Sequence, residues 1–142
     1  MEATATLRCR GHPLVTGSHP TTFEVTAGDQ LTEKGTCIIA VGADSGCAGL
    51  PEPFRKILAH DDAVLVTTLA CGGAEVTIRS RGSARFTLDH PADLVWRRSP
   101  FVCGRTIGIL SDRVAATLPR ELIGNLSAGK EMVVTLCVRR PG

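Results

Sequence analysis

The sequence predicts an α+β protein in which strands dominate and one structural unit occurs twice. Two observations carry this prediction. Short apolar or alternating runs, bounded by Gly, Pro and polar residues, recur along the chain as they do in β-strands. The second half also repeats residue types of the first half in the same order. At 142 residues, with 43% hydrophobic and 21% charged residues, the chain has the size and composition of one globular domain.

The repeat becomes visible when "TLRCRG" (6–11) is placed over "TIRSRG" (77–82), an offset of 71 residues. The same offset aligns His19 with His90, and each histidine is followed by proline. An offset of 68 residues then aligns Leu50-Pro51 with Leu118-Pro119 and Val66-Thr67 with Val134-Thr135. We therefore predict a single domain over residues 1–142, made by internal duplication, with halves of about 5–71 and 76–139.

Each half is predicted to have the element order β-β-β-α-β. The first strands are "ATLRCR" (5–10) and "VTIRSR" (76–81), and the second are "TTFEVT" (21–26) and "DLVWRR" (93–98). The third strands are "TCIIAVG" (36–42) and "RTIGILS" (105–111). The last strands are "AVLVTTLAC" (63–71) and "MVVTLCV" (132–138).

A helix is predicted to begin at each Leu-Pro pair, because proline is well tolerated in the first helical turn. Apolar residues follow at i, i+4 and i+8 in both halves, so each helix should bury one face. These residues are Leu50, Phe54 and Leu58 in the first half and Leu118, Leu122 and Leu126 in the second. We expect Phe54 and Leu122 to be core residues.

Neither unit is large enough to enclose a core, so the two should pack about a pseudo-two-fold axis. A closed, barrel-like arrangement of intertwined halves is the preferred architecture, because closure removes exposed sheet edges. Two sheets flanked by helices is the alternative.

The composition excludes several functional classes. A net charge of +2 does not by itself indicate nucleic-acid binding. The N-terminus lacks the apolar core of a signal peptide, and no apolar run approaches the ~20 residues of a membrane helix, so we expect a cytoplasmic protein without a membrane partner. The six cysteines have no C-x-x-C spacing; we predict no zinc site and expect most of them to be buried thiols.

The blocks "GHPLVTGSHPTTFEVT", "LTEKGTCIIAVGAD" and "DHPADLVWRRSPFVCGRT" resemble the archaeal domain-of-unknown-function 371 family, a group of small single-domain proteins. The resemblance covers nearly the whole chain and implies an archaeal, cytosolic source. It implies no activity, so a site has to be argued from chemistry. Where the family pattern has Asp before the first cysteine of these blocks, this chain has Thr36, so that position is not expected to be a required acid.

The two His-Pro turns are the main candidates for a functional site. A geometric role is possible, since proline holds the preceding residue extended. Polar neighbours favour function: Glu24 and hydroxyl residues surround the first turn, while Asp93 and arginines surround the second. We predict that both turns line one pocket, with His19 and His90 within ~12 Å, because ligand sites combine a cleft with convergent polar groups. The predicted ligand-binding residues are His12, His19, Thr21, Thr22, His90, Asp93, Arg97 and Arg105.

Other residues have a structural interpretation as the favoured one. Asp44 and Asp112 fit as helix N-caps, and His60 fits as a helix C-terminal cap. Trp96 is expected in the core, although it could stack on a base. Cys103 beside Arg105 could be a low-pKa thiol, but a buried thiol is favoured.

Three functions stay open. The first is binding of an anionic, phosphate-bearing ligand, a nucleotide or RNA, at a composite polar site between the halves; the lack of repeated aromatics weakens RNA. The second is a small enzyme with His19 or His90 as general base and Asp93 or Glu24 orienting it, or with a two-histidine metal site. The third is a structural or assembly module. No cofactor is indicated.

Overall fold

The computed structural model describes residues 1–142 and contains eight strands, two α-helices and two short 3₁₀ helices. The first half has β1 (Glu2–Arg10), β2 (Thr22–Thr26), β3 (Ile38–Ala40), η1 (Cys47–Gly49), α1 (Glu52–Leu58) and β4 (Val64–Cys71). The second half has β5 (Ala74–Arg81), β6 (Asp93–Arg97), β7 (Thr106–Gly108), η2 (Ala115–Thr117), α2 (Arg120–Ser127) and β8 (Glu131–Arg139). The expected β-rich α+β class and the expected element order are confirmed.

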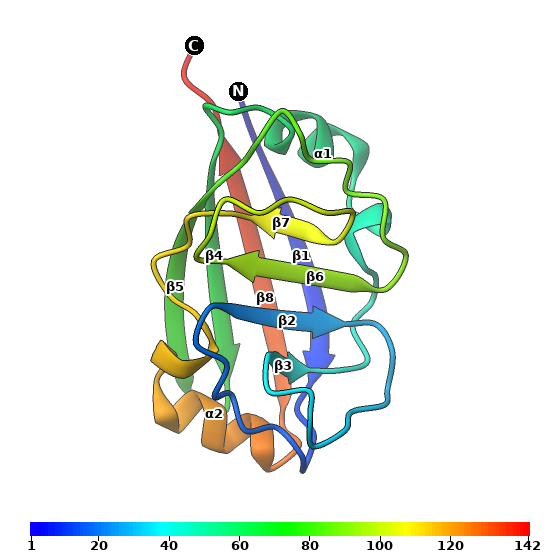
Figure 1. The fold of residues 1–142 in the computed structure, drawn as a ribbon, viewed down its shortest axis with the longest axis vertical. Helices are drawn as coiled ribbons and strands as arrows, with labels where there is room; N and C mark the ends of the chain where they lie inside the picture. The colour runs from blue at the N-terminus through cyan, green and yellow to red at the C-terminus, as the bar shows by residue number, and fades with distance from the viewer.

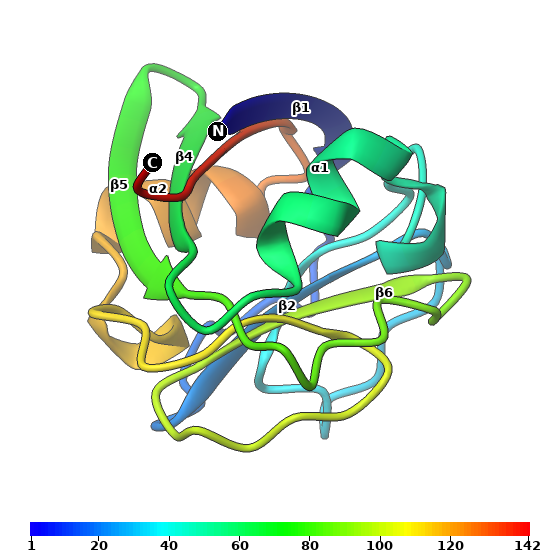
Figure 2. The same cartoon turned by 90° about the horizontal axis from the view of Figure 1, so that it is seen from above.

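The strands form two four-stranded sheets. The first sheet has the order β1-β8-β4-β5 and is antiparallel throughout. The second sheet has the order β3-β2-β6-β7, with an antiparallel central pair and a parallel strand on each side. The strands of the two sheets cross at a steep angle (Figure 1), and the view down the long axis shows β2 and β6 on one side of the molecule with β4 and β5 on the other (Figure 2).

The preferred closed barrel is not found. Only single bridges, Arg10 with Val41 and Arg81 with Ile109, join the edges of the two sheets. The reason is the length of the edge strands β3 and β7, which have three residues each and end before a continuous ladder can form. The alternative of two sheets with helices is the better description. The helices lie at opposite ends of the long axis, where α1 packs against β1 and β8 and α2 against β4 and β5 (Figure 1).

The core lies between the sheets. The rings of Phe23 and Trp96 stack with centroids 4.5 Å apart, and the Trp96 indole Nε1 donates to the Thr67 hydroxyl at 2.9 Å, which connects the second sheet to the first. Each α-helix begins directly after its proline. The six apolar helix-face residues of the sequence analysis are all buried, so the expectation that Phe54 and Leu122 are core residues is confirmed.

The two halves pair with each other through matching registers. Cys9 pairs with Met132 and Ser80 pairs with Leu65, so Leu65 corresponds to Met132 when Cys9 and Ser80 are taken as equivalent. On this assumption, the registers differ by one residue from the alignment of Val66-Thr67 with Val134-Thr135. A one-residue slip moves every side chain of a strand to the opposite face.

Candidate functional site

Alternation along the central strands of the second sheet separates a core face from a polar face. The core face carries Phe23, Val25, Leu94 and Trp96, all fully buried. Because successive side chains of a strand point to opposite faces, their neighbours form the polar face, where Thr22 pairs with Arg97, Glu24 with Val95, and Thr26 with Asp93. We call this the polar face of the second sheet.

A hydrogen-bonded cluster occupies the middle of this polar face. One nitrogen of Arg105, Nη1, donates to Glu24 Oε1 at 3.2 Å and to Asp93 Oδ2 at 3.1 Å. The Thr26 hydroxyl donates to the other Asp93 oxygen at 2.8 Å, and the Cys37 thiol lies 3.9 Å from Glu24 Oε1. We call these five residues the carboxylate–arginine cluster. It joins Glu24 of the first half to Asp93 and Arg105 of the second.

One carboxyl group of the cluster, that of Glu24, has a pKa near neutral pH. Burial and, next to it, the Asp93 carboxylate raise the pKa of Glu24 to about 7, against the opposing effect of Arg105 and Arg97. The Glu24 side chain is only 5% exposed, whereas that of Arg105 is 41% exposed. A buried acid is thus connected to the surface through a charged guanidinium.

Arg97 and Cys103 form a second group beside the cluster. The Arg97 guanidinium donates to the Thr106 hydroxyl at 2.9 Å and to Cys103 Sγ at 3.3 Å, and it lies 4.9 Å from the centre of the exposed Phe101 ring. Burial alone would raise the pKa of Cys103, but hydrogen bonds from the Arg105 backbone and the Thr106 and Arg97 side chains lower it to about 7. The expectation of a buried thiol is wrong for Cys103, which is only partly buried.

The histidines of the two His-Pro turns accept hydrogen bonds from backbone N–H groups at the starts of β2 and β6. His19 Nδ1 accepts from the Thr21 and Thr22 backbone N–H groups, and His90 Nδ1 accepts from those of Ala92 and Asp93, at 2.9–3.3 Å. Each histidine carbonyl also accepts a backbone N–H from the other half. The geometric role considered from the sequence is thus present in both turns.

The shared pocket expected between the turns is not found. None of the four cavities of the molecule is lined by His19 or His90. Since β2 and β6 are antiparallel, the turns that precede them lie at opposite ends of a five-residue ladder, which is ~13 Å long. The pseudo-two-fold axis expected from the sequence would cross the middle of this ladder. The antiparallel pairing of β2 with β6 therefore separates the two turns instead of bringing them together.

The structure brings together half of the predicted ligand-binding residues. Asp93 and Arg105 belong to the cluster, Arg97 lies beside it, and His90 Nε2 is 3.8 Å from Asp93 Oδ2. Thr22 lies at the edge of the polar face, opposite Arg97. His19 and the exposed Thr21 contact each other but not the cluster, and His12 Nδ1 accepts only the Leu14 N–H, at 3.0 Å.

Several expected helix caps have other partners. Asp44 and Asp112 accept the backbone N–H groups of Arg8 and Arg79, both at 2.9 Å, so each aspartate ties a loop to an edge strand and caps no helix. The 3₁₀ helices that follow these aspartates have no side-chain cap from them. His60 Nδ1 does approach the Ile57 carbonyl at the end of α1, at 3.3 Å.

Sequence reasoning missed Thr26, Cys37, Phe101 and Thr106 as members of the site region. For Phe101 a signal was present, because an aromatic residue between Pro100 and a polar turn is not part of an alternating strand. For Thr26 and Cys37 there was none, since their role depends on which strands become neighbours. No group of three or more His, Cys, Asp or Glu side chains is arranged to hold a metal ion.

These features define a class of protein: a small α+β domain of two four-stranded sheets, with a carboxylate–arginine cluster beside the central pair of one sheet. Within that class, the chain belongs to the family described as a domain of unknown function, DUF371, which matches residues 7–139. It is similar to the uncharacterised protein MJ0206 of Methanocaldococcus jannaschii, with 33% identity over 132 residues, or 93% of this chain and 97% of that protein. The resemblance stated from the sequence is confirmed. Neither helix of the structure has the length and apolar character needed to cross a membrane.

Proposed function

We propose that the protein binds a nucleotide-like anionic ligand at the polar face of the second sheet. In this proposal Arg97 and Arg105 hold a phosphate group, and Phe101 stacks on the base. The observation that carries the proposal is that two arginines of this face have unused N–H groups, and that one of them, Arg97, lies against the single exposed aromatic ring of the protein.

The phosphate would be held by donors that the protein itself leaves free. Arg97 has no carboxylate partner and uses Nε and Nη2 for Thr106 and Cys103. Arg105 uses only Nη1 for Glu24 and Asp93. A guanidinium presents five N–H donors in a planar fork, which suits phosphate oxygens.

The base would be held by Phe101. This ring is 58% exposed, and the Arg97 guanidinium already lies against it. An exposed ring beside cations is the usual platform for a nucleobase. Because the other three phenylalanines and Trp96 are buried, the surface offers one stacking position, which favours a single nucleotide over a long RNA.

Glu24 would couple binding to proton uptake. Arg105 stabilises the ionised form of Glu24, and a bound phosphate would share that positive charge. The pKa of Glu24 should then rise above its value of about 7, and a proton should be taken up when the ligand binds near neutral pH.

The composite nature of this site is supported by a common origin of the two halves, which we also propose here. Glu24 pairs directly with Val95, and the sequence offset of 71 residues makes these two positions equivalent. A two-fold axis would therefore pass through this pair. On the axis the two copies share one location, so an acid in one copy and an apolar residue in the other produce an asymmetric site.

A small enzyme is the second candidate, favoured by one observation. Two groups on the same face, the Glu24 carboxyl and the Cys103 thiol, both have a pKa of about 7. Such groups exchange protons readily at neutral pH, as acid–base catalysis requires. Conversion of a nucleotide by the wild type, lost in C103S or E24Q, would favour this candidate over binding alone.

Isothermal titration with 5′-mononucleotides and with the matching nucleosides tests the binding proposal. We expect each nucleoside, which lacks the phosphate, to bind at least about tenfold more weakly than its nucleotide. R97Q and F101A should each weaken nucleotide binding by about tenfold or more. Titration in two buffers of different ionisation enthalpy should reveal proton uptake that E24Q abolishes.

R98Q is the matched control, because Arg98 is the neighbouring, exposed arginine and makes no side-chain hydrogen bond. It should change nucleotide affinity less than twofold, as a screened surface charge does. Equal losses in R97Q and R98Q, or no binding of any mononucleotide by the wild type, would contradict the proposal.

A further inference from the structure

Two pockets lie at equivalent places at the ends of the outer strands of the first sheet. In each, an Arg-x-Arg segment ends the strand, and the backbone N–H of its first arginine donates to an aspartate from the loop after β3 or β7. The β1 pocket, of about 170 Å³, is lined by Arg8, Cys9, Arg10, Gly42, Asp44 and Glu131. The β5 pocket, of about 250 Å³, is lined by Arg79, Ser80, Arg81, Leu110, Asp112 and Val64.

Of the two arginines of the β1 pocket, Arg8 has a carboxylate partner, and Arg10 fills part of the pocket. Arg8 Nη1 forms an ion pair with Glu131 Oε1 at 2.7 Å. The Arg10 guanidinium lies so close to Gly42 that a Cβ at this position would overlap with Nη1. The β1 pocket is therefore neutralised by an acid and partly filled by its own guanidinium.

Two replacements reverse this situation in the β5 pocket. Arg81 pairs with Val64 where Arg10 pairs with Glu131, so the acid is replaced by an apolar residue. Leu110 stands where the first half has Gly42, and both have positive φ values, 50° and 63°. A leucine in this conformation is strained, and such residues concentrate at functional sites.

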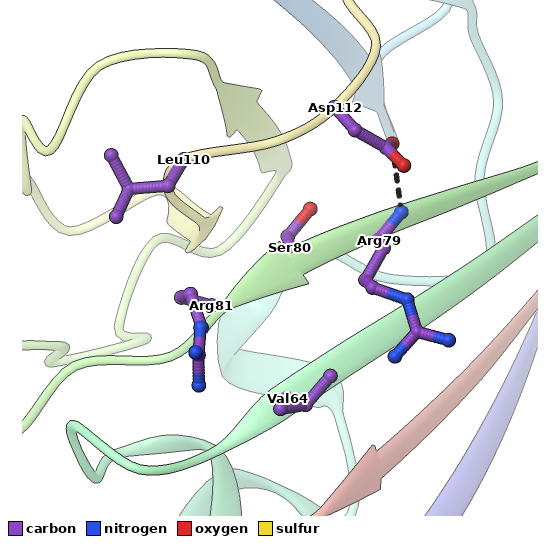
Figure 3. Close-up of a pocket in the computed structure, with 6 residues that line it drawn as sticks. All are labelled: Val64, Arg79, Ser80, Arg81, Leu110 and Asp112. Atoms are coloured by element: carbon purple, nitrogen blue, oxygen red, sulfur yellow. Dashed lines mark hydrogen bonds between the residues drawn. The ribbon is translucent and has the colours of Figure 1, made fainter.

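The side chains of the β5 pocket are arranged as these replacements require. In the β1 pocket the Arg10 guanidinium lies over Gly42, where a Cβ would overlap with it. Leu110 has such a Cβ, so a guanidinium cannot take the corresponding place in the β5 pocket. Arg79 and Arg81 extend on either side of Val64, and Leu110 lies apart from both (Figure 3). Neither arginine forms an ion pair or a side-chain hydrogen bond, while the Asp112 carboxylate is engaged by the Arg79 backbone.

The positive surface continues from the β5 pocket along the sheet. A neighbouring cavity of about 360 Å³ shares Val64 and Arg79 and extends to Arg139 and Arg140. Val64 pairs with Arg81 on one side and with Arg139 on the other, so both guanidiniums start from the same face of the sheet. Arg140 is neutralised by Asp62 at 2.6 Å, and Glu2, across from Arg139, makes no ion pair. Three arginines are left without a carboxylate: Arg79, Arg81 and Arg139.

We propose that the β5 pocket and the adjoining cavity bind a ligand with two or more linked phosphate groups. Three guanidiniums around an apolar floor can each take a phosphate by paired N–H donors. A single phosphate would contact only part of this surface. This site lies on the first sheet and is distinct from the nucleotide site proposed on the second.

Isothermal titration with inorganic tripolyphosphate, ATP and AMP at low salt tests the proposal. In R97Q, which weakens the proposed second-sheet site, tripolyphosphate and ATP should bind at least about tenfold more tightly than AMP. R81Q and V64E should weaken tripolyphosphate binding by about tenfold or more, the first by removing a donor and the second by restoring the acid of the β1 pocket. R10Q is the matched control and should change affinity less than twofold.

Equal losses in R81Q and R10Q would overturn the proposal, because binding would then follow overall charge. Thermal melts identify a V64E variant that fails to fold, and R81Q at an exposed position keeps the test valid in that case. A single-stranded RNA without terminal phosphates is the fourth ligand; tighter binding of this RNA than of tripolyphosphate would also overturn the proposal. R97Q should leave tripolyphosphate affinity unchanged, so failure of the second-sheet site and failure of this one are distinguishable.

Discussion

Glu24 is the residue at which burial and charge oppose each other most directly in this molecule. Its carboxyl group is almost inaccessible, lies next to a second carboxylate, and has a single guanidinium nitrogen as its charged partner. Burial and the Asp93 carboxylate raise the pKa of Glu24 more than the Arg105 charge lowers it, so the pKa is about 7. The residue is therefore expected to influence stability as well as ligand binding.

Glu24→Gln should remove a pH dependence of folding. The folded-state pKa of about 7 is above the ordinary value of 4.5, so the folded protein binds the proton more tightly than the unfolded chain. Glu24 should thus lower the free energy of unfolding, by on the order of a few kcal/mol, as the pH rises from about 4.5 to about 7, with no further loss above. Denaturant melts of wild type and E24Q at pH 5 and pH 8 measure this. Identical pH slopes for the two proteins would show that Glu24 is ionised throughout.

Cys103 should be the first cysteine to react with iodoacetamide. The thiolate is the reactive form, and its pKa is lowered to about 7 by the hydrogen bonds that outweigh burial. Peptide mapping by mass spectrometry should show a reaction rate at Cys103 with a midpoint near pH 7, moved to higher pH in R97Q. Cys9 provides the internal control, because burial raises its pKa to about 12 and it should stay unmodified. Faster labelling of Cys9 than of Cys103 would rule out this assignment.

At the scale of single elements, short helices depend on packing and not on intrinsic helix stability. α1 and α2 have seven and eight residues, too few to be stable alone. Each helix covers one end of the molecule, and the spacing of apolar residues in the sequence predicted which of its faces is buried. The glycines that follow β1 and β5 allow close contact, since a Cβ on Gly11 would overlap with the Leu126 carbonyl oxygen and a Cβ on Gly82 with that of Leu58.

Phe54→Ala and Leu122→Ala should each lower the free energy of unfolding by ~2–5 kcal/mol, because both side chains are fully buried and their removal leaves a cavity. Urea melts measure the loss. Lys56→Ala on the exposed side of α1 is the control and should change stability by less than about 0.5 kcal/mol. A comparable loss in the control would show that the helix as a whole, and not its buried face, determines the effect.

At the scale of the whole molecule, the halves are intertwined. β1 pairs with β8, β4 with both β5 and β8, and β2 with β6, so every central ladder joins the two halves. Neither half contains a complete sheet, and within a half only one parallel pair of strands is hydrogen-bonded, β2 with β3 or β6 with β7. The two halves should therefore fold together in one cooperative transition.

Cleavage between Gly72 and Gly73, in the turn from β4 to β5, tests this interdependence. The fragment 73–142 contains Trp96, whose ring stacks on Phe23 of the other fragment. Alone, it should show the red-shifted fluorescence of a solvated indole and little secondary structure by circular dichroism. Addition of fragment 1–72 should restore a blue-shifted emission. Native-like fluorescence of fragment 73–142 alone would contradict the intertwined fold.

The sequence by itself determined the β-rich α+β class, the order of elements, and the burial of the helix faces. These properties follow from local periodicity and from breakers such as Gly and Pro, which act within a few residues. It also pointed to Asp93, Arg97 and Arg105, because charged residues in an otherwise apolar strand have few structural uses. The family membership followed from the same ordered blocks.

Only the tertiary structure decided how the strands pair, and hence which polar groups meet. Antiparallel pairing of β2 with β6 sends the two His-Pro turns to opposite ends of a ladder and places Glu24 beside Arg105. The edge strands β3 and β7 have only three residues each, so two sheets form in place of a barrel. Strand register depends on contacts between residues far apart in the chain, and the pKa values of Glu24 and Cys103 depend on burial that those contacts create. No local pattern encodes either.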